Sequence, residues 1–455
     1  MNAIVTRDAI EQLQLGLPDL DWITDPGRVE RLSQDFSWFS PVLKRRLDGK
    51  RAEIVVRPRT EDEIRSIVSA CVRLKVAITL RGSGTGNYGQ TTPLAGGVVI
   101  DMTSFKSPLW TRPGVTRAQA GIRLGELERL VNTSGQELRC MPSTFRSATL
   151  GGLFGGGFGG IGSINYGPLA APGNVLGVRA MTIEAEPQIV ELRGEDALRM
   201  HHQWGTNGLV LELEIALAPA HPWLESIITF GVFEQALAFG NALAQAPGLV
   251  KREVAFLASP VPEYLKQLTE HLPKGCHAVL ALVAESDEQA LLKLIDQHAG
   301  TLSYRKTAEE ARKSHRTLME FTWNHTTLNA LKVDPTLTYL QSSFVPGLHL
   351  QQITEMERLL GGEVLMHTEF LRTVDGLMTC SALQLVRFTT EERLNEIIAI
   401  YRQRGVRINN PHVCIVEDGK AGGTLPIETV QMKARFDPHA LLNPGKLRNF
   451  PVPWA

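Results

Sequence analysis

Cysteine is scarce in this chain of 455 residues: there are five, Cys71, Cys140, Cys276, Cys380 and Cys414, and they lie far apart. They form no CxxC pair and no spacing typical of a zinc site. An odd number without a pattern argues against a disulfide framework and fits reduced, buried thiols. We therefore expect a cytoplasmic protein without a structural metal ion.

The sequence also lacks an excess of charge and a long hydrophobic run. The formal net charge is −1, so no basic face is indicated for nucleic acid or for an anionic membrane. The first residues, MNAIVTRDAIEQLQ, contain no signal-peptide core. The longest clearly apolar run, residues 278–284, is far too short to span a bilayer. Length and ordinary composition predict a globular protein of two or three domains.

Glycine is abundant and concentrated. Nine of the seventeen residues from 151 to 167 are glycine, within the stretch PSTFRSATLGGLFGGGFGGIGSINYG (142–167). Glycine loses more conformational entropy on folding than any other residue. Such a high density of glycine therefore indicates either a flexible linker or a backbone that a bulky ligand approaches closely. The large apolar residues in the stretch favour a buried loop that cradles a ligand. The GxGxxG match at Gly155, Gly157 and Gly160 is no nicotinamide site, because the Pro- and Gly-containing segment after it opposes a crossover helix.

A second glycine loop, RGSGTGNYGQ (81–90), lies between two expected strands. Strands are predicted over residues 52–56, 76–80 and 97–101, and a helix that begins with the capping box Thr60 and Glu63 is predicted through residue 75. The alternating glycines free successive backbone N–H groups to bind one phosphate, which exceeds the needs of a plain turn. The loop lacks the Lys-Ser/Thr ending of a nucleoside-triphosphate loop.

The order of expected strands and helices changes after Pro219 and Pro222, which mark a boundary in the chain. Before them we expect a short strand at 117–121, a helix at 124–134, a hairpin at 175–192, a short helix at 195–203 and an alternating strand at 205–217. After them, strands at 226–233, 253–257, 278–284 and 301–304 enclose helices at 234–245, 262–271 and 288–298. This order is typical of a split βαβ, ferredoxin-like unit and predicts a second domain.

Three separated stretches resemble one family. RGSGTGNYG with GGVVIDM, the 142–167 stretch and ARFDPHALLNPGK (434–446) resemble the FAD-linked oxidoreductases of vanillyl-alcohol oxidase and p-cresol methylhydroxylase, most of all the 2-hydroxyacid dehydrogenase and glycolate-oxidase-subunit type. The resemblance implies an α+β fold. A two-part FAD-binding domain of the p-cresol methylhydroxylase type would span residues 1–222. A ferredoxin-like antiparallel-sheet cap for substrate would span 223–424, and a C-terminal return 425–455.

The resemblance also implies the residues that bind FAD. The pyrophosphate would be wrapped by Arg81, Gly82, Ser83, Gly84, Thr85, Gly86 and Asn87. The flavin and its ribityl chain would be lined by Pro142, Ser143, Thr149, Gly151, Gly152, Gly160, Gly162 and Ser163. The adenine end would meet Gly208 and Val210, and Asn443 would approach the flavin.

Two departures from the family are informative. Members with a histidyl-linked flavin carry His where this chain has Thr85, so we expect FAD to be bound without a covalent link. The His-Xaa-Gly-Asp-Gly-Asn-Xaa-His stretch of the metal-binding hydroxyacid dehydrogenases is absent, which argues against a metal site and a D-lactate-type mechanism.

Oxidation of an alcohol needs a proton acceptor, for which histidine is suited. The candidates are His325 and His412, in polar stretches of the expected cap, with Tyr339 as the next choice; each has a purely structural role as its alternative. Trp323 is either a wall of the substrate pocket or core. Arg372 and Arg387 are either clamps for a carboxylate or surface cations on strands.

The sequence thus predicts an FAD-dependent enzyme that oxidises a small alcohol or 2-hydroxy acid. The alternatives are a non-catalytic or electron-relaying FAD-binding subunit of a larger oxidase, and a binding protein that has lost its flavin. The substrate's identity, the electron acceptor and the oligomeric state, a homodimer included, stay open.

Overall fold

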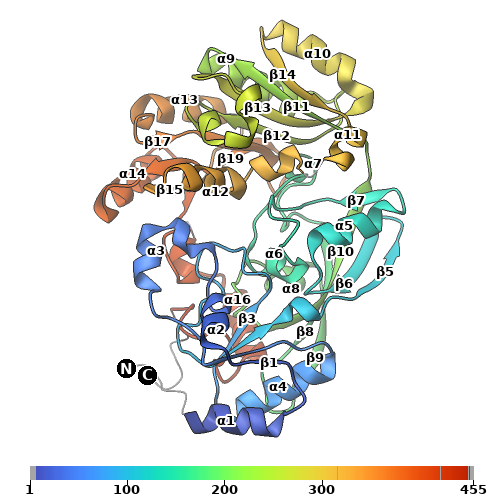
Figure 1. Cartoon of the computed structure of the whole chain (residues 1–455), viewed down its shortest axis with the longest axis vertical. Helices are drawn as coiled ribbons and strands as arrows, with labels where there is room; N and C mark the ends of the chain where they lie inside the picture. Colours follow the sequence, from blue (N-terminus) through green and yellow to red (C-terminus); the bar gives the residue numbers. More distant parts are fainter. Residues whose placement is uncertain (1–6, 315, 421, 449, 451–455) are drawn as a thin grey trace.

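The computed structural model describes residues 7–314, 316–420, 422–448 and 450. The strands up to β10 form one part of the molecule, at the bottom of Figure 1, and the strands from β11 onward form the other, at the top. Helix α16 (Ile427–Phe436), near the end of the chain, returns to the lower part. Among the described residues, no helix combines the length and the apolar character that crossing a membrane requires.

Three of the four strands of the first sheet lie where the sequence predicts them, and β1 (Trp22–Ile23) was not predicted. Strands β2 (Ile54–Val56), β4 (Val98–Asp101) and β3 (Ile78–Arg81) are parallel, and β1 pairs antiparallel with β2. Helix α4 (Glu61–Leu74) connects β2 to β3 and buries its apolar face. Thr60 caps the helix by accepting the Glu63 N–H, as expected, but the Glu63 carboxylate accepts from the N–H of Arg59 instead of completing the capping box.

The second sheet is antiparallel, in the order β5-β6-β10-β8-β9, with β7 on the end of β10. Its strands are β5 (Pro108–Arg112), β6 (Val115–Gln119), β7 (Gln136–Leu138), β8 (Val175–Met181), β9 (Ile189–Arg193) and β10 (Leu209–Pro219). Helices α5 (Leu124–Asn132) and α8 (Gly194–Leu198) accompany it. The predicted hairpin is the β8–β9 pair, and α8 ends five residues before the predicted helix does.

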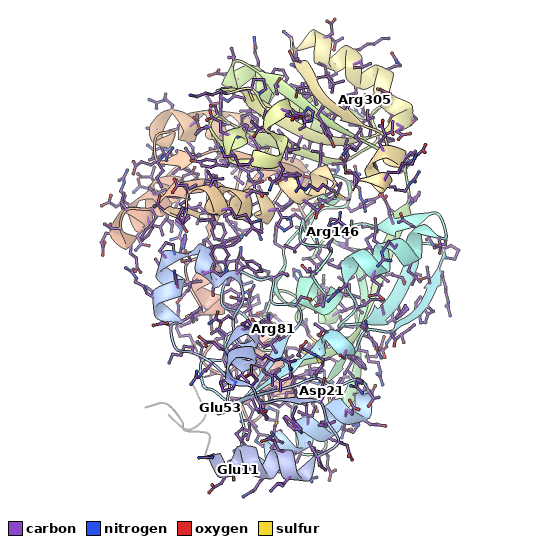
Figure 2. All side chains as sticks on the ribbon, in the orientation of Figure 1. Glu11, Asp21, Glu53, Arg81, Arg146 and Arg305 are labelled. Atoms are coloured by element: carbon purple, nitrogen blue, oxygen red, sulfur yellow. The ribbon has the colours of Figure 1, made fainter. Side chains whose placement is uncertain are left out.

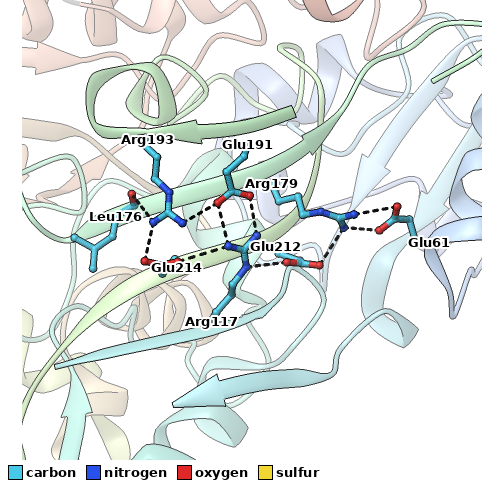
Figure 3. A network of polar contacts seen from close by, with 8 residues as sticks. All are labelled: Glu61, Arg117, Leu176, Arg179, Glu191, Arg193, Glu212 and Glu214. Carbon is cyan, nitrogen blue, oxygen red and sulfur yellow. Dashed lines mark hydrogen bonds and ion pairs between the residues drawn. The ribbon is translucent and has the colours of Figure 1, made fainter. Parts of the chain in front are cut away.

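The half-exposed face of this sheet carries alternating charges instead of apolar residues. Arginines from β6, β8 and β9 pair with glutamates of β9 and β10, and Arg179 also pairs with Glu61 at the start of α4 (Figure 3). Each such pair contributes little alone, but this network joins the second sheet to helix α4, which connects two strands of the first sheet. The opposite face is thereby left to pack the core.

The glycine stretch is not wholly a loop. Residues Leu150–Gly156 form helix α6, capped by Thr149, whose Oγ1 accepts the Gly152 N–H at 3.2 Å. Leu150, Leu153 and Phe154 lie at helical spacing and are buried, so packing outweighs the poor helix propensity of glycine. The prediction of a loop was wrong over these residues, and a further short helix, α7 (Ser163–Tyr166), follows.

The upper sheet has eight antiparallel strands in the order β14-β11-β13-β12-β18-β19-β16-β21. Strands β11 (Trp223–Phe230), β12 (Lys251–Leu257), β13 (His277–Ala284) and β14 (Thr301–Lys306), with helices α9 (Phe233–Gln245) and α10 (Glu288–Gln297), have the strand order of the ferredoxin-like unit. The predicted helix at 262–271 is instead two 3₁₀ turns, η3 (Val261–Tyr264) and η4 (Lys266–His271).

Four later strands extend this sheet in a way the sequence did not indicate. They are β16 (Gln341–Ser343), β18 (His367–Arg372), β19 (Met378–Ala382) and β21 (Arg407–Asn409). Helices α12 (Asn324–Val333), α13 (His349–Leu360) and α14 (Glu391–Gln403) and a small sheet of β15 (Leu337–Tyr339), β17 (Val364–Leu365) and β20 (Leu385–Arg387) complete this part.

The end of the chain joins the edge of the first sheet. The Ile78 N–H donates to the Leu441 carbonyl at 2.8 Å, and the Asn443 N–H donates to the Ile78 carbonyl at 2.6 Å. These bonds extend β3 by a short parallel bridge. The segment after α16 therefore lies beside the strand that leads into the first glycine loop.

Candidate functional site

A cavity with an empty volume of about 1630 Å³, part of it open to solvent, lies between the two parts of the molecule. Its lower wall comes from the loop after β3, from residues 142–159 and from residues 200–210. Its upper wall comes from the start of α12, from β16, β19 and β21 and from the residues beside them. Arg81 lies in the interior of the lower part, and Arg146 lies where the two parts meet (Figure 2).

The loop after β3 lines the cavity with every residue from 81 to 87. A Cβ on Gly82 would lie 2.2 Å from Thr149 Oγ1, and one on Gly84, at φ +68°, would lie 2.2 Å from the Arg81 guanidinium. That guanidinium donates to the carbonyls of Gln34 and Ser83 at 2.5 and 3.3 Å. Arg81 thus braces the loop as well as facing the cavity.

Two buried donors on the cavity wall have no hydrogen-bond partner among the described residues: Asn87 Nδ2 and Trp204 Nε1. A buried donor without an acceptor costs about 1–3 kcal/mol, so such atoms indicate a bound acceptor. FAD carries acceptors along its whole length, in the pyrophosphate, the ribityl chain and the ring. The orphaned donors and the bare glycine backbone therefore fit FAD.

Most of the other residues predicted for FAD also face this cavity. Pro142, Thr149, Gly151, Gly152, Gly208 and Val210 line it. Asn443 lies behind the wall and donates to the carbonyls of Gln90 and Trp204 at 2.9 and 2.7 Å, while its Oδ1 is buried without a partner. Ser143 is also behind the wall, where its Oγ accepts the His325 N–H at 3.3 Å. Contact of each residue with FAD stays a prediction.

Three predicted wall residues, Gly160, Gly162 and Ser163, are not among those that line the cavity. A Cβ on Gly160 would lie 2.0 Å from the Met141 carbonyl, and one on Gly162, at φ +96°, would lie 2.3 Å from the Arg139 carbonyl. The Ser163 Oγ accepts the Gly160 N–H at 3.0 Å. Here the glycines are required by close packing of the chain on its own backbone.

The three predicted proton acceptors lie in different environments, and none lines the cavity. His325 follows the lining residue Asn324, and its Nδ1 is buried without a partner. His412 uses both ring nitrogens, with Nδ1 2.8 Å from Ser40 Oγ and Nε2 2.9 Å from the Tyr339 carbonyl. The hydroxyl of Tyr339 is buried without a partner. Burial lowers the pKa of His325 and lowers the pKa of His412 to about 4, so both rings are neutral at pH 7.

Of the three predicted substrate contacts, only Trp323 lines the cavity. Arg372 donates to the Gly376 carbonyl at 2.8 Å, within the turn between β18 and β19. Arg387 is exposed at the end of β20. Neither arginine is in a position to clamp a carboxylate in the cavity.

Sequence reasoning missed an aromatic group on the lower wall, formed by Tyr88, His202 and Trp204. Tyr88 stacks on Trp204 with ring centroids 5.2 Å apart, and its hydroxyl donates to Gln341 of β16 in the opposite wall. His202 and Trp204, on either side of Gln203, both have positive φ, 54° and 53°, which is an unusual backbone conformation for large side chains. Tyr88 follows the first glycine loop directly, which was a usable signal, but the backbone angles leave no mark in the sequence.

His202 also contacts a cation. Lys420 Nζ lies 3.2 Å from His202 Nδ1, and because an ammonium only donates, this nitrogen accepts and Nε2 carries the proton. Burial lowers the pKa of His202 well below its usual value and lowers the pKa of Lys420 to about 8. His202 is therefore a neutral hydrogen-bond donor on the cavity wall and is no proton acceptor.

Comparisons with known proteins agree with this geometry. Residues 52–192 match the family model of an FAD binding domain. The chain is 28% identical over 204 residues to the glycolate oxidase subunit GlcD of Escherichia coli, a match that covers 43% of this chain and 40% of that protein. It is 26% identical over 437 residues to the D-lactate dehydrogenase of Anaerostipes hadrus, covering 87% of this chain and 90% of that one.

A solved structure shares the fold. Alkyldihydroxyacetonephosphate synthase superposes with a TM-score of 0.72 at 16% identity, over 97% of this chain and 85% of that chain. The similarity extends through both parts of the molecule. At this identity it concerns the fold alone.

Proposed function

Because this chain is an FAD-linked oxidoreductase of the vanillyl-alcohol oxidase and p-cresol methylhydroxylase family, we propose that it oxidises the CH–OH group of a small alcohol or 2-hydroxy acid. The observation that carries the proposal is the single cavity that joins a glycine cradle fit for FAD to a wall of hydrogen-bonding side chains. The names of the relatives, a glycolate oxidase subunit and a D-lactate dehydrogenase, support the same class of reaction.

We assign the lower part, residues 1–222, to FAD, and residues 223–424, here called the cap, to the substrate. The last segment, 425–455, returns to the FAD side. The cradle of residues 81–87 would hold the pyrophosphate, with Gly152 and Thr149 beside the ribityl chain. When bound, FAD supplies the redox chemistry by accepting a hydride at N5. Thr85 has no ring nitrogen with which to form the histidyl link, so the cofactor is held without a covalent bond.

The cap side of the cavity supplies neutral groups. Its described lining residues are Trp323, Asn324, Gln341, Ser342, Ser343, Ser381, Ala382, Leu383 and Asn409, and none of these is ionisable. The Oδ1 of Asn324 is buried without a partner and is available as an acceptor. These side chains suit a substrate hydroxyl, whose donor and acceptor sites they match.

For the proton of the substrate hydroxyl we favour His325. Its ring is neutral at pH 7, its Nδ1 has no partner among the described residues, and it directly follows Asn324, which lines the cavity. A proton acceptor must come within about 3 Å of the substrate oxygen, although such contacts often tighten only in the bound complex. His412 is less suited, because both of its nitrogens are engaged.

A second function stays open: an FAD-binding subunit that relays electrons without oxidising a substrate itself. The relative from Escherichia coli is named as a subunit, which favours this alternative. The polar cap wall favours the enzyme. The electron acceptor and a homodimer are parts of the same open question.

We expect the purified protein to be yellow and to bleach without oxygen when its substrate is added. The panel should contain glycolate, lactate and 2-hydroxyglutarate, each beside the neutral alcohol of matching carbon skeleton. Stopped-flow absorbance measures the rate of flavin reduction. A parallel reduction by dithionite shows that the flavin can be bleached. If dithionite bleaches the flavin and no alcohol or hydroxy acid does, the proposal of an enzyme is wrong and that of an electron-relaying subunit replaces it.

A further inference from the structure

Trp323, which lines the cap side of the cavity, has a backbone that tryptophan rarely adopts. Its φ is 51° and its ψ is −138°, just before α12 begins. Such conformations cost about 1–3 kcal/mol and persist only where surrounding contacts enforce them. The contacts that hold Trp323 are therefore part of how this wall is built.

Two buried glutamates hold Trp323 by both of its donors. The backbone N–H donates to Glu369 Oε1 at 2.6 Å, and the indole Nε1–H donates to Glu253 Oε2 at 3.3 Å. His367 Nε2 lies 2.8 Å from the same oxygen of Glu369. Glu253 lies on β12, and His367 and Glu369 point to the same face of the adjacent β18. His367 and Glu369 are fully buried, and Glu253 is 2% exposed.

The remaining oxygens of the two carboxyl groups have no donor. Glu253 Oε1 and Glu369 Oε2 are buried without a partner among the described residues, and the two carboxyl groups lie on paired strands and bind the two donors of the same residue, Trp323. Two carboxyl groups buried beside each other away from water are not both ionised, so one of them holds a proton. The neighbouring Arg252 does not replace it, because its guanidinium contacts Glu128 at 2.7 Å and Glu137 at 3.4 Å.

Among the described residues, no group of three or more His, Cys, Asp or Glu side chains is arranged to hold a metal ion. A proton bound to one glutamate leaves a single negative charge on the pair, and the Trp323 N–H and His367 Nε2 both contact Glu369 Oε1.

We propose that Glu253 is a neutral carboxylic acid that donates its proton to the Glu369 carboxylate, and that this pair positions Trp323 against the substrate. Neither glutamate lines the cavity, so both act through the tryptophan as positioning residues. Burial raises the pKa of Glu253 well above its usual value, and the adjacent Glu369 raises it further, which agrees with the location of the proton. The positioning role rests on the function proposed above, but the location of the proton does not.

Infrared spectroscopy of the holoprotein at pH 7 tests the location of the proton. We expect the difference spectrum, parent minus Glu253→Gln, to contain the C=O stretching band of a protonated carboxylic acid. A spectrum without that band, or a band that survives in Glu253→Gln and disappears in Glu369→Gln, would overturn the assignment. This measurement needs no turnover, so it stands even if the protein oxidises nothing.

Activity of two matched variants tests the positioning. Glutamine at 253 keeps an acceptor for the indole and a donor for Glu369, so flavin reduction by substrate should stay within about twofold of the parent. Leucine has similar size but removes both bonds, and loss of a hydrogen bond to a charged group predicts a rate about 10- to 100-fold lower. Both variants must hold FAD normally. Equal rates for Glu253→Leu and the parent, or a Glu253→Gln variant that fails to fold or is as slow as Glu253→Leu, would refute the proposal.

Discussion

Replacing Gly152 with valine is expected to remove FAD while the chain stays folded. Gly152 lines the cavity, and a Cβ there would meet only Thr149 Oγ1, at 2.9 Å. The two methyl groups beyond the Cβ would enter the space that we assign to the ribityl chain. Overpacking costs about 1–3 kcal/mol, and each 1.4 kcal/mol is tenfold in affinity, so we expect binding to weaken by about 5- to 150-fold.

Flavin content measured beside circular dichroism is the test. The matched control is Gly248→Val: Gly248 is exposed, has no atoms within 4 Å of an added Cβ and should keep its full complement of flavin. Bound FAD stabilises the fold by mass action, so the melting temperature of Gly152→Val should fall toward that of the parent stripped of flavin, and no lower. Full yellow colour in Gly152→Val would place the ribityl chain elsewhere.

Replacing His325 with alanine is expected to slow anaerobic flavin reduction by about 10²- to 10⁴-fold, the usual cost of losing a general base. Burial holds the pKa of His325 below its ordinary value, with Glu320 opposing this shift and Lys332 adding to it. The base is active when neutral, so the rate should stay constant as pH falls through about 6.5 and decline only below that. Stopped-flow reduction of the holoprotein across this pH range measures both effects.

His412→Ala is the matched comparison. This change removes the bonds to Ser40 Oγ, which keeps the Leu43 N–H as a partner, and to the Tyr339 carbonyl; a buried donor or acceptor left unsatisfied costs about 1–3 kcal/mol of stability. We expect a lower free energy of unfolding, measured by denaturation, and a parental rate of flavin reduction. If His412→Ala is slow and His325→Ala is not, the roles are reversed; if neither is slow, the base is another group, such as Tyr339.

The elements with strong periodicity could be predicted from the sequence. Helix α4 and the strands around it follow from apolar residues at helical or alternating spacing, and the ferredoxin-like strand order follows from the succession of strands and helices after Pro222. Helix α6 was missed because glycine opposes a helix locally, and only the burial of Leu150, Leu153 and Phe154 in the folded protein stabilises it.

The candidate site also has a part that could be predicted from the sequence and a part that could not. The cradle of residues 81–87 is continuous in sequence, so its pattern marks it directly. The cap wall is assembled from four separate segments, and Gln341 or Asn409 carries no local signal of its position. His412 resembled a catalytic histidine because it lies in a polar stretch, but burial and its two partners, 372 and 73 residues away in the sequence, set its environment.

The central claim is that FAD occupies the cavity without a covalent bond to the chain. Acid precipitation of the purified yellow protein, followed by mass spectrometry of the supernatant, tests it most directly. We expect a colourless pellet and FAD in the supernatant, in an amount close to one per chain. Colour that stays with the pellet would mean a covalent link despite Thr85, and FMN in the supernatant would mean that the cradle of residues 81–87 holds no pyrophosphate.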